Sequence, residues 1–174
     1  AWANEHGIPE TPRGSGTSVT GAILPFNGGI VMDLGLLNQV VEVRREDGLA
    51  VVQAGTICKD LNTALEPTHF FAPDPGSSSV CTIGGMVACN ASGLRAVKYG
   101  TTKDHILGLK VVMPDGTLIK TGTDAPKNSS GLDLTRLIVC SEGTLGIIVE
   151  VTVKILPKPE KVAFAKALFN TVED

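Results

Sequence analysis

The chain has 174 residues, enough for one domain or two small ones, and 43% of them are hydrophobic, so a packed core is expected. A formal net charge of −3 and an aromatic content of 4% argue against a nucleic-acid-binding surface, which requires a basic field or stacking rings. No stretch approaches the roughly 20 apolar residues of a membrane span, and no signal-peptide pattern opens the sequence, so we expect no transmembrane segment.

The first part of the chain predicts short strands and a hairpin. Gly7 is expected to stop a helix, and a short strand follows it. A buried strand is expected at Gly29–Leu34. Val40–Val43 and Leu49–Ala54 predict a hairpin whose turn is formed by residues 45–48.

Two helices separated by a loop are expected in the middle of the chain. Thr56–Leu65 predicts a helix with Thr56 as its N-cap, because apolar residues recur there on one face. Phe70–Cys81 is expected to be a loop. Thr82 is then expected to cap a short helix that runs through Ser92.

The second half again predicts more strand than helix. We expect a hairpin at Ile106–Met113 with Thr117–Thr121, a polar loop at Gly122–Gly131 and a short helix at Leu132–Val139. A long strand at Gly146–Leu156, a further strand at Val162–Phe169 and the cap of another helix at Thr171–Asp174 are expected to follow. Since strands outnumber helices and form hairpins, the fold class is expected to be α+β.

The loop at residues 12–21, P-R-G-S-G-T-S-V-T-G, is the most informative segment. Its glycines let backbone N–H groups approach a ligand, and successive N–H groups form a nest for an anion. Arg13 adds a charge-assisted contact to phosphate. The loop therefore predicts a pyrophosphate site, with a glycine-rich surface turn as the alternative. It is neither a Walker loop nor a Rossmann fingerprint, because it lacks G-K-[ST] and leads into Pro25 rather than a helix.

A second segment, residues 73–93, reads P-D-P-G-S-S-S-V-C-T-I-G-G-M-V-A-C-N-A-S-G. Its hydroxyl groups are possible ligand donors. Gly84 and Gly85 would place unpaired N–H groups at a helix start, where they would point outward. The small residues that follow would let a flat ligand approach the backbone. Tight packing of this helix against a sheet is the alternative, and the sequence leaves both open.

A third segment, residues 140–148, reads C-S-E-G-T-L-G-I-I. Its glycines precede a strand, and such a turn can present backbone groups to the edge of a heterocycle. Glu142 would accept a hydrogen bond from a ribose hydroxyl, or would merely cap the turn.

No segment offers a catalytic constellation of its own. There is no Ser-His-Asp order with an elbow motif and no pair of carboxylates on one element, and His69 and His105 are isolated. The chemistry is therefore expected to come from a cofactor, from protein outside this chain, or from both.

Taken in order, the segments resemble the flavin-binding domain of the vanillyl-alcohol oxidase / p-cresol methylhydroxylase (PCMH) superfamily. The closest branch is that of the FAD-linked 2-hydroxy-acid dehydrogenases, with D-lactate dehydrogenase and the glycolate oxidase flavoprotein subunit. K-Y-G at residues 98–100 and P-D-G at residues 114–116 add to the match. The resemblance implies a PCMH-type FAD-binding domain of two α+β subdomains at residues 1–160. It also implies that most of the N-terminal strand-helix unit is missing and that a C-terminal cap domain only begins at residues 161–174.

By the same resemblance, the first segment would hold the pyrophosphate, the second would line the rest of the cofactor and the third would meet the adenosine end. No catalytic or metal-ligating residue is expected within the chain. The expected FAD-binding residues are Pro12, Arg13, Gly14, Ser15, Gly16, Thr17, Ser18 and Gly21, then Pro75, Gly76, Ser77, Ser78, Ser79, Thr82, Ile83, Gly84, Gly85, Cys89, Asn90, Ala91, Ser92 and Gly93, then Glu142, Gly143, Thr144, Gly146, Ile147 and Ile148.

The sequence departs from the family pattern at three positions. Thr17 stands where relatives that attach FAD covalently through this loop have histidine, so non-covalent FAD is expected. Cys140 stands where relatives usually have glycine, and because a cysteine disfavours positive φ, the backbone conformation there is an open question. Ser15 also replaces a usual glycine.

The reaction implied for the parent enzyme is oxidation of a 2-hydroxy acid, of the D-lactate or glycolate type, to a 2-oxo acid by hydride transfer to flavin N5. A quinone, a cytochrome or a partner flavoprotein or iron–sulfur subunit would accept the electrons. The isolated fragment is expected to be inactive, because half of the substrate pocket would be missing. The alternatives are another superfamily member, similar to alkyldihydroxyacetonephosphate synthase or UDP-N-acetylenolpyruvoylglucosamine reductase, and a non-catalytic flavin-binding module.

The cysteines are expected to be buried free thiols. None of the four belongs to a C-x-x-C pair, and the three histidines do not lie at zinc-ligand spacing. Free thiols suit a reducing compartment, so a cytoplasmic location is expected, with a peripheral membrane contact left open for the parent. The cysteines are Cys58, Cys81, Cys89 and Cys140.

Overall fold

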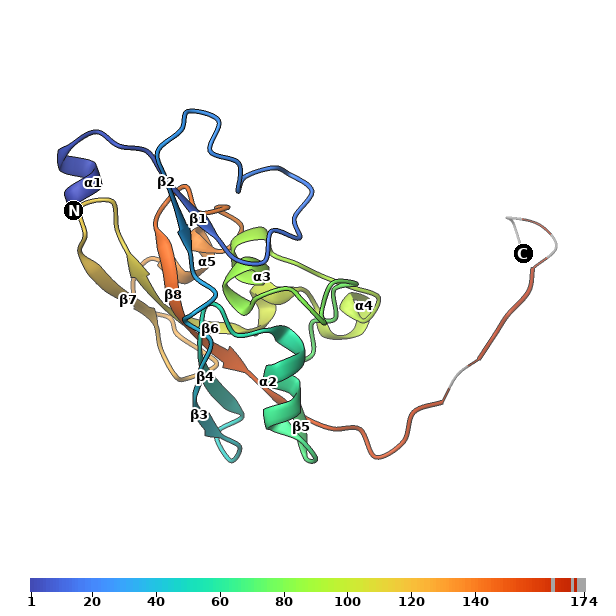
Figure 1. Cartoon of the computed structure of the whole chain (residues 1–174). Coiled ribbons are helices and arrows are strands. Elements are labelled where there is room, and N and C mark those ends of the chain that lie inside the picture. The colour runs from blue at the N-terminus through green and yellow to red at the C-terminus, as the bar shows by residue number, and fades with distance from the viewer. Residues whose placement is uncertain (164, 170, 172–174) are drawn as a thin grey trace.

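A five-stranded antiparallel sheet forms the centre of the computed structural model, which describes residues 1–163, 165–169 and 171 (Figure 1). Its strand order is β3-β4-β8-β6-β7. The strands are β3 (Val40–Arg44), β4 (Leu49–Gln53), β6 (Ile106–Val112), β7 (Leu118–Gly122) and β8 (Ile147–Lys154). Both expected hairpins are confirmed, and β8 joins them by pairing with β4 on one side and β6 on the other.

Three helices pack on this sheet. The helix α2 (Cys58–Leu65) contacts β3, α3 (Ile83–Cys89) contacts β4 and β8, and α5 (Leu134–Ile138) contacts β6 and β7. The alternation expected for β8 is found only in part, since Val151 and Val153 are fully buried in the same core cluster as Leu61 of α2 but Thr152 between them is buried too. The class is therefore α+β, as expected.

The remaining elements are short and lie around the sheet. They are α1 (Trp2–Glu5), β1 (Glu10–Arg13), β2 (Ile30–Asp33), β5 (His69–Phe70), α4 (Ala96–Tyr99), a 3-10 helix η1 (Thr102–His105) and β9 (Leu156–Pro157). The helix and strand expected around Gly7 are confirmed as α1 and β1. β1 and β2 form a separate parallel pair, and β5 pairs with β9. The strand expected at Gly29–Leu34 is therefore found, but it is not buried, since Val31 is 43% exposed.

Two helix boundaries differ from the prediction for local reasons. Thr56 does not cap α2, because its Oγ1 donates to the Gln39 carbonyl (3.2 Å) and Ile57 occupies the N-cap position. The helix α3 ends at Cys89 rather than Ser92, because Asn90 adopts a left-handed conformation with φ of 49°.

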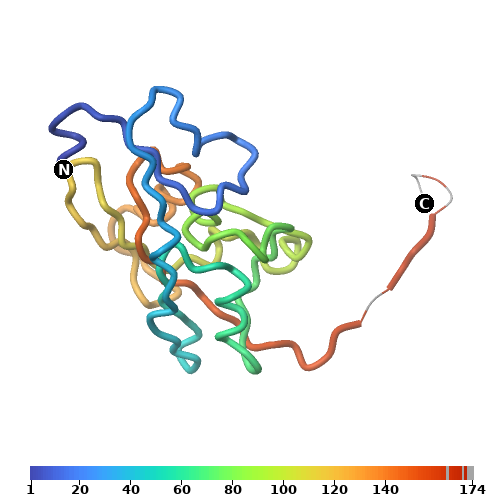
Figure 2. The backbone as a smooth tube through the Cα atoms, in the orientation of Figure 1, coloured from blue at the N-terminus to red at the C-terminus, as the bar shows by residue number. Residues whose placement is uncertain are grey.

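The chain after β9 leads away from the sheet (Figure 2). The strand expected at Val162–Phe169 is wrong for the described residues of that range, which are exposed and form no strand. Of the helix cap expected at Thr171–Asp174, all but Thr171 lies outside the described residues.

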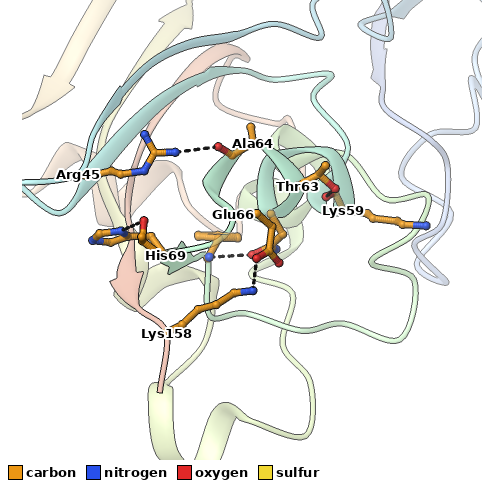
Figure 3. A network of polar contacts seen from close by, with 10 residues as sticks. Arg45, Lys59, Thr63, Ala64, Glu66, His69 and Lys158 are labelled. Carbon is orange, nitrogen blue, oxygen red and sulfur yellow. Dashed lines mark hydrogen bonds and ion pairs between the residues drawn. The ribbon is translucent and has the colours of Figure 1, made fainter. Parts of the chain in front are cut away.

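A network of polar contacts holds the C-terminal end of α2 (Figure 3). Arg45 Nη2 donates to the Ala64 carbonyl (3.1 Å), and Lys158 forms an ion pair with Glu66. These contacts join the β3–β4 turn, α2 and the chain after β9. His69 lies in the same network, where its Nδ1 is 3.0 Å from the Thr68 Oγ1. His69 therefore lies on a surface that is separate from the three predicted site segments.

Candidate functional site

A cavity of about 320 Å³ opens where the three predicted segments meet. This volume falls within the range of roughly 300–1,000 Å³ that small-molecule and cofactor sites occupy. The lining residues are Pro12, Arg13, Gly14, Ser15, Gly16, Thr17, Ser18, Val19, Ala22, Ile23, Leu34, Ser77, Cys81, Thr82, Gly84, Gly85, Met86, Ala88, Cys89, Ala91, Glu142, Gly143, Gly146 and Ile148. Segments far apart in the sequence thus share one site.

The first segment lines the cavity almost completely, and the other two do so in part. The predicted residues that do not line the cavity are Gly21, Pro75, Gly76, Ser78, Ser79, Ile83, Asn90, Ser92, Gly93, Thr144 and Ile147. Sequence reasoning missed seven lining residues, of which most are apolar: Val19, Ala22, Ile23, Leu34, Cys81, Met86 and Ala88. It sought polar and glycine positions, whereas the walls of a cofactor site are mostly apolar. Most of these seven residues lie near predicted residues in the sequence, and that was the only signal that could have identified them as cavity residues.

The loop after β1 presents unpaired backbone donors. Among the described residues, no hydrogen-bond partner is found for the backbone N–H groups of residues 14–18. Gly16 has φ of 69°, a conformation that an L-residue adopts only with strain. The loop therefore retains successive donors for an anion, with the Arg13 side chain at the same cavity.

The Ser15 hydroxyl anchors this loop to a neighbouring segment. Ser15 Oγ donates to the Val80 carbonyl at 2.5 Å, which ties the loop to the chain before α3. The Ser18 and Thr20 hydroxyls lie 3.0 Å apart and pair with each other. The Ser15 hydroxyl proton is therefore used within the protein.

The start of α3 is closed by the protein itself. Thr82 is the N-cap, as predicted, and its Oγ1 accepts from the Gly85 N–H at 3.1 Å. The N–H groups of Ile83 and Gly84 donate to the Thr56 and Ala54 carbonyls at 2.8 and 2.7 Å. The expectation of outward-pointing N–H groups at Gly84 and Gly85 is therefore wrong.

The small residues of α3 serve packing at its first turn. A Cβ on Gly84 would lie 2.7 Å from the Ala54 Cβ, closer than side chains approach, so only glycine lets α3 sit on the end of β4. The packing interpretation is correct for Gly84. Farther along the helix, Ala88 and Cys89 line the cavity, so that face of α3 remains open to a ligand.

The turn before β8 is held by the end of α3. The N–H groups of Cys140 and Glu142 donate to the Val87 and Ala88 carbonyls at 3.1 and 2.9 Å. Both donors have left-handed backbone, with φ of 70° at Cys140 and 51° at Glu142. Cys140 thus keeps the conformation that a glycine would adopt without strain, and the turn brings Glu142 to the cavity wall.

Titratable groups are few in the cavity wall. In the described part of the chain, its ionisable members are Arg13, Glu142, Cys81 and Cys89, and no histidine lines it. No cluster of three or more possible metal-ligating side chains is found in the described part of the chain. None of the helices described there is long and apolar enough to cross a membrane.

The fold and the site define a class: an α+β cofactor-binding domain in which a loop, rather than a helix start, presents donors to an anion. Residues 1–122 match the family described as FAD binding domain, and the chain belongs to this family. FAD is accordingly its cofactor, and the unpaired donors of residues 14–18 fit the pyrophosphate of that molecule.

Relatives of the hydroxy-acid branch match nearly the whole chain. It is 44% identical over 171 residues to "Glycolate oxidase subunit GlcD" of Bacillus subtilis, which covers 98% of the chain and 36% of that protein. It is 39% identical over 172 residues to a D-lactate dehydrogenase of Anaerostipes hadrus, with the same coverage. The chain thus spans about a third of the length of these curated relatives.

A solved structure shares the fold. An alkyldihydroxyacetonephosphate synthase superposes with a TM-score of 0.79 at 29% identity, over 91% of this chain and 31% of that one. Together with the family match, this confirms the PCMH-type FAD-binding fold that the three segments predicted.

Proposed function

We propose that the protein to which this chain belongs oxidises a 2-hydroxy acid of the D-lactate or glycolate type to the 2-oxo acid, and that this chain supplies its FAD site. The bound FAD would supply the hydride acceptor, flavin N5. The observation that carries the proposal is the row of unpaired N–H groups at residues 14–18 beside a cofactor-sized cavity. The similarity to proteins named for glycolate and D-lactate oxidation supports the substrate class.

Residues of this chain would bind and orient the cofactor. The N–H groups of residues 14–18 and the Arg13 guanidinium would neutralise the pyrophosphate. The chain from Glu142 to Ile148 would meet the adenosine end, and the α3 face at Ala88 and Cys89 would lie against the flat part of the ligand. Thr17 offers no nucleophilic nitrogen, so the flavin would be held without a covalent link.

The proton of the substrate hydroxyl would be removed by a group outside this chain. Among the residues that the structure describes, Glu142 is the only carboxylate in the cavity wall, and the proposal places it at the adenosine end. Since no histidine lines the cavity either, the base and the substrate-binding cations would come from the remainder of the longer protein. An external acceptor such as a quinone, a cytochrome or a partner flavoprotein or iron–sulfur subunit would then reoxidise the flavin.

Flavin binding by this chain tests the site. Titration of the chain with FAD, followed by flavin fluorescence, should show saturable binding, and riboflavin, which lacks the pyrophosphate, should bind far more weakly. Arg13→Met should weaken FAD binding, whereas Arg136→Met, which removes an exposed arginine paired with Asp133, should not. Acid precipitation should leave the flavin in the supernatant. Equal affinity for FAD and riboflavin would argue against the pyrophosphate site.

Substrate oxidation needs the longer protein. With FAD bound and an artificial acceptor dye, D-lactate or glycolate should reduce the dye, and L-lactate serves as the control for chirality. If the protein binds FAD but no 2-hydroxy acid reduces it, the reaction class is wrong, and a non-redox member of the superfamily or a flavin-binding module becomes the better assignment.

A further inference from the structure

Two buried cysteines face each other beside the cavity. Cys58 is the first residue of α2, and Cys81 precedes Thr82, the N-cap of α3. Ile57 and Thr82 form an antiparallel bridge, flanked by hydrogen bonds from the Cys58 N–H to the Cys81 carbonyl (3.0 Å) and from the Ile83 N–H to the Thr56 carbonyl (2.8 Å). Cys58 and Cys81 therefore lie directly beside this bridge and are joined to each other by a backbone hydrogen bond.

The spacing of such a pair suits a disulfide. Backbone dimensions place the Cα atoms of two residues joined by such a hydrogen bond about 5–6.5 Å apart, within the roughly 4.4–6.8 Å that a disulfide spans. Both cysteines are free thiols, and both side chains are buried in the same core cluster. Their backbones are already in direct contact, because the Cys58 N–H donates to the Cys81 carbonyl at 3.0 Å. The backbone therefore needs little or no movement to close the bond.

The two thiols differ in their pKa and in whether they line the cavity. Hydrogen bonding from the Cys58 thiol lowers the pKa of Cys81 to about 7, whereas the same contact raises the pKa of Cys58. Cys81 lines the cavity, and Cys58 lies behind it. A small oxidant entering the cavity thus meets the sulfur with the greater thiolate fraction, and the thiolate is the form that reacts.

We propose that Cys58 and Cys81 are a site of oxidative modification, at which a peroxide converts the dithiol to an intramolecular disulfide. The Cys81 thiolate attacks the peroxide O–O bond and gives a sulfenic acid and, for hydrogen peroxide, hydroxide, which takes up a proton from solvent and becomes water. The Cys58 sulfur then attacks the Cys81 sulfur, and hydroxide leaves and takes up the Cys58 proton as a second water. The two sulfurs lose two electrons in total, and the peroxide gains them. The new bond joins the start of α2 to the start of α3 at the wall of the cavity.

The test uses the remaining cysteines as a matched control. The full chain carrying Cys89→Ser and Cys140→Ser keeps only the proposed pair, and the chain carrying Cys58→Ser and Cys81→Ser keeps the other two. Both variants are treated with hydrogen peroxide, and the remaining peroxide is removed with catalase. The proteins are then unfolded in the presence of N-ethylmaleimide, which labels free thiols, and their masses are measured by mass spectrometry. Circular dichroism before treatment shows that each variant is folded.

The variant that keeps Cys58 and Cys81 should lose both thiols together and therefore take up no N-ethylmaleimide. Its mass should be two hydrogen atoms below that of the unlabelled reduced chain, and dithiothreitol should restore both thiols. Trypsin should then release residues 46–59 linked to residues 60–95, a pair of peptides that Cys89→Ser leaves with one cysteine each. The control variant should keep both thiols as monomer. In Cys58→Ser, dimedone should trap the sulfenic acid on Cys81, because the resolving thiol is gone.

Three results would overturn the proposal. One is a disulfide between chains in place of the internal one. Another is Cys81 oxidised to sulfinic acid with Cys58 still free. The third is no thiol loss in the folded chain at a peroxide concentration that oxidises the urea-unfolded chain.

Discussion

Gly143 lies against the ring of Pro12, so closely that a Cβ atom on Gly143 would be 2.7 Å from the Pro12 Cγ. Pro12 is the last residue but one of β1, next to the loop of residues 14–18, and Gly143 belongs to the turn before β8. Both line the cavity. A similar approach joins Gly14 to the second segment, since a Cβ there would lie 2.4 Å from the Thr82 Oγ1. The three segments thus pack into one site because glycines at the contacts let the facing segments approach closely.

Gly143→Ala should be strongly destabilising. The alanine would suffer both the contact with Pro12 and a φ of 83°. Left-handed strain costs roughly 1–2 kcal/mol and overpacking about 1–3 kcal/mol, so the free energy of unfolding should fall by about 2–5 kcal/mol in urea denaturation. Gly131→Ala is the matched control, because Gly131 has φ of 74° with nothing within 4 Å of a Cβ. Equal losses in the two variants would show that the contact with Pro12 contributes nothing.

The Thr82 hydroxyl should contribute measurably to stability through α3. Thr82→Val keeps the shape of the side chain but leaves the Gly85 N–H without its acceptor. Loss of an N-cap oxygen costs about 0.5–2 kcal/mol, and urea denaturation should show a loss of that size. Thr82→Ser retains the oxygen and should lose less. If Thr82→Val is as stable as the unchanged chain, the cap contributes nothing.

These contacts show which parts of the site can be predicted from sequence. The hairpins and the Thr82 cap were predictable because their turn and cap residues act on close neighbours in the chain. The roles of Gly84 and Gly143 were not, because the atoms that forbid a side chain there belong to Ala54 and Pro12, in other segments. For the same reason the Thr56 cap was predicted wrongly, since its hydroxyl donates to Gln39 across a tertiary contact.

Stability should fall on mild acidification because of His105. This ring is 3% exposed, and its Nε2 donates to the Tyr99 carbonyl at 2.8 Å. Burial lowers the pKa of His105 below 6.5, with Lys154 acting in the same direction and Asp104 opposing it. Between the folded pKa and 6.5, only the unfolded chain takes up the proton, so the free energy of unfolding rises with pH there and levels off above it.

Urea denaturation between about pH 5 and pH 8 would measure this dependence. His105→Gln can keep a donor to the Tyr99 carbonyl and should flatten the profile. His69→Gln, at the surface network of Figure 3, should leave the profile unchanged. A slope that survives in His105→Gln would assign the pH dependence to other groups.

Cys140→Gly should stabilise the chain, which few substitutions do. Cys140 is exposed and has φ of 70°, so its Cβ contributes strain without buried contacts in return. Relief of left-handed strain gains roughly 1–2 kcal/mol, and the greater freedom of glycine in the unfolded chain offsets about 0.5–1 kcal/mol of it. A net gain of up to about 1.5 kcal/mol should appear in urea denaturation. Cys140→Ala removes the thiol but keeps the Cβ, so it should show no such gain. A gain of equal size in the alanine variant would mean that the thiol, and not the backbone conformation, is the source of the strain.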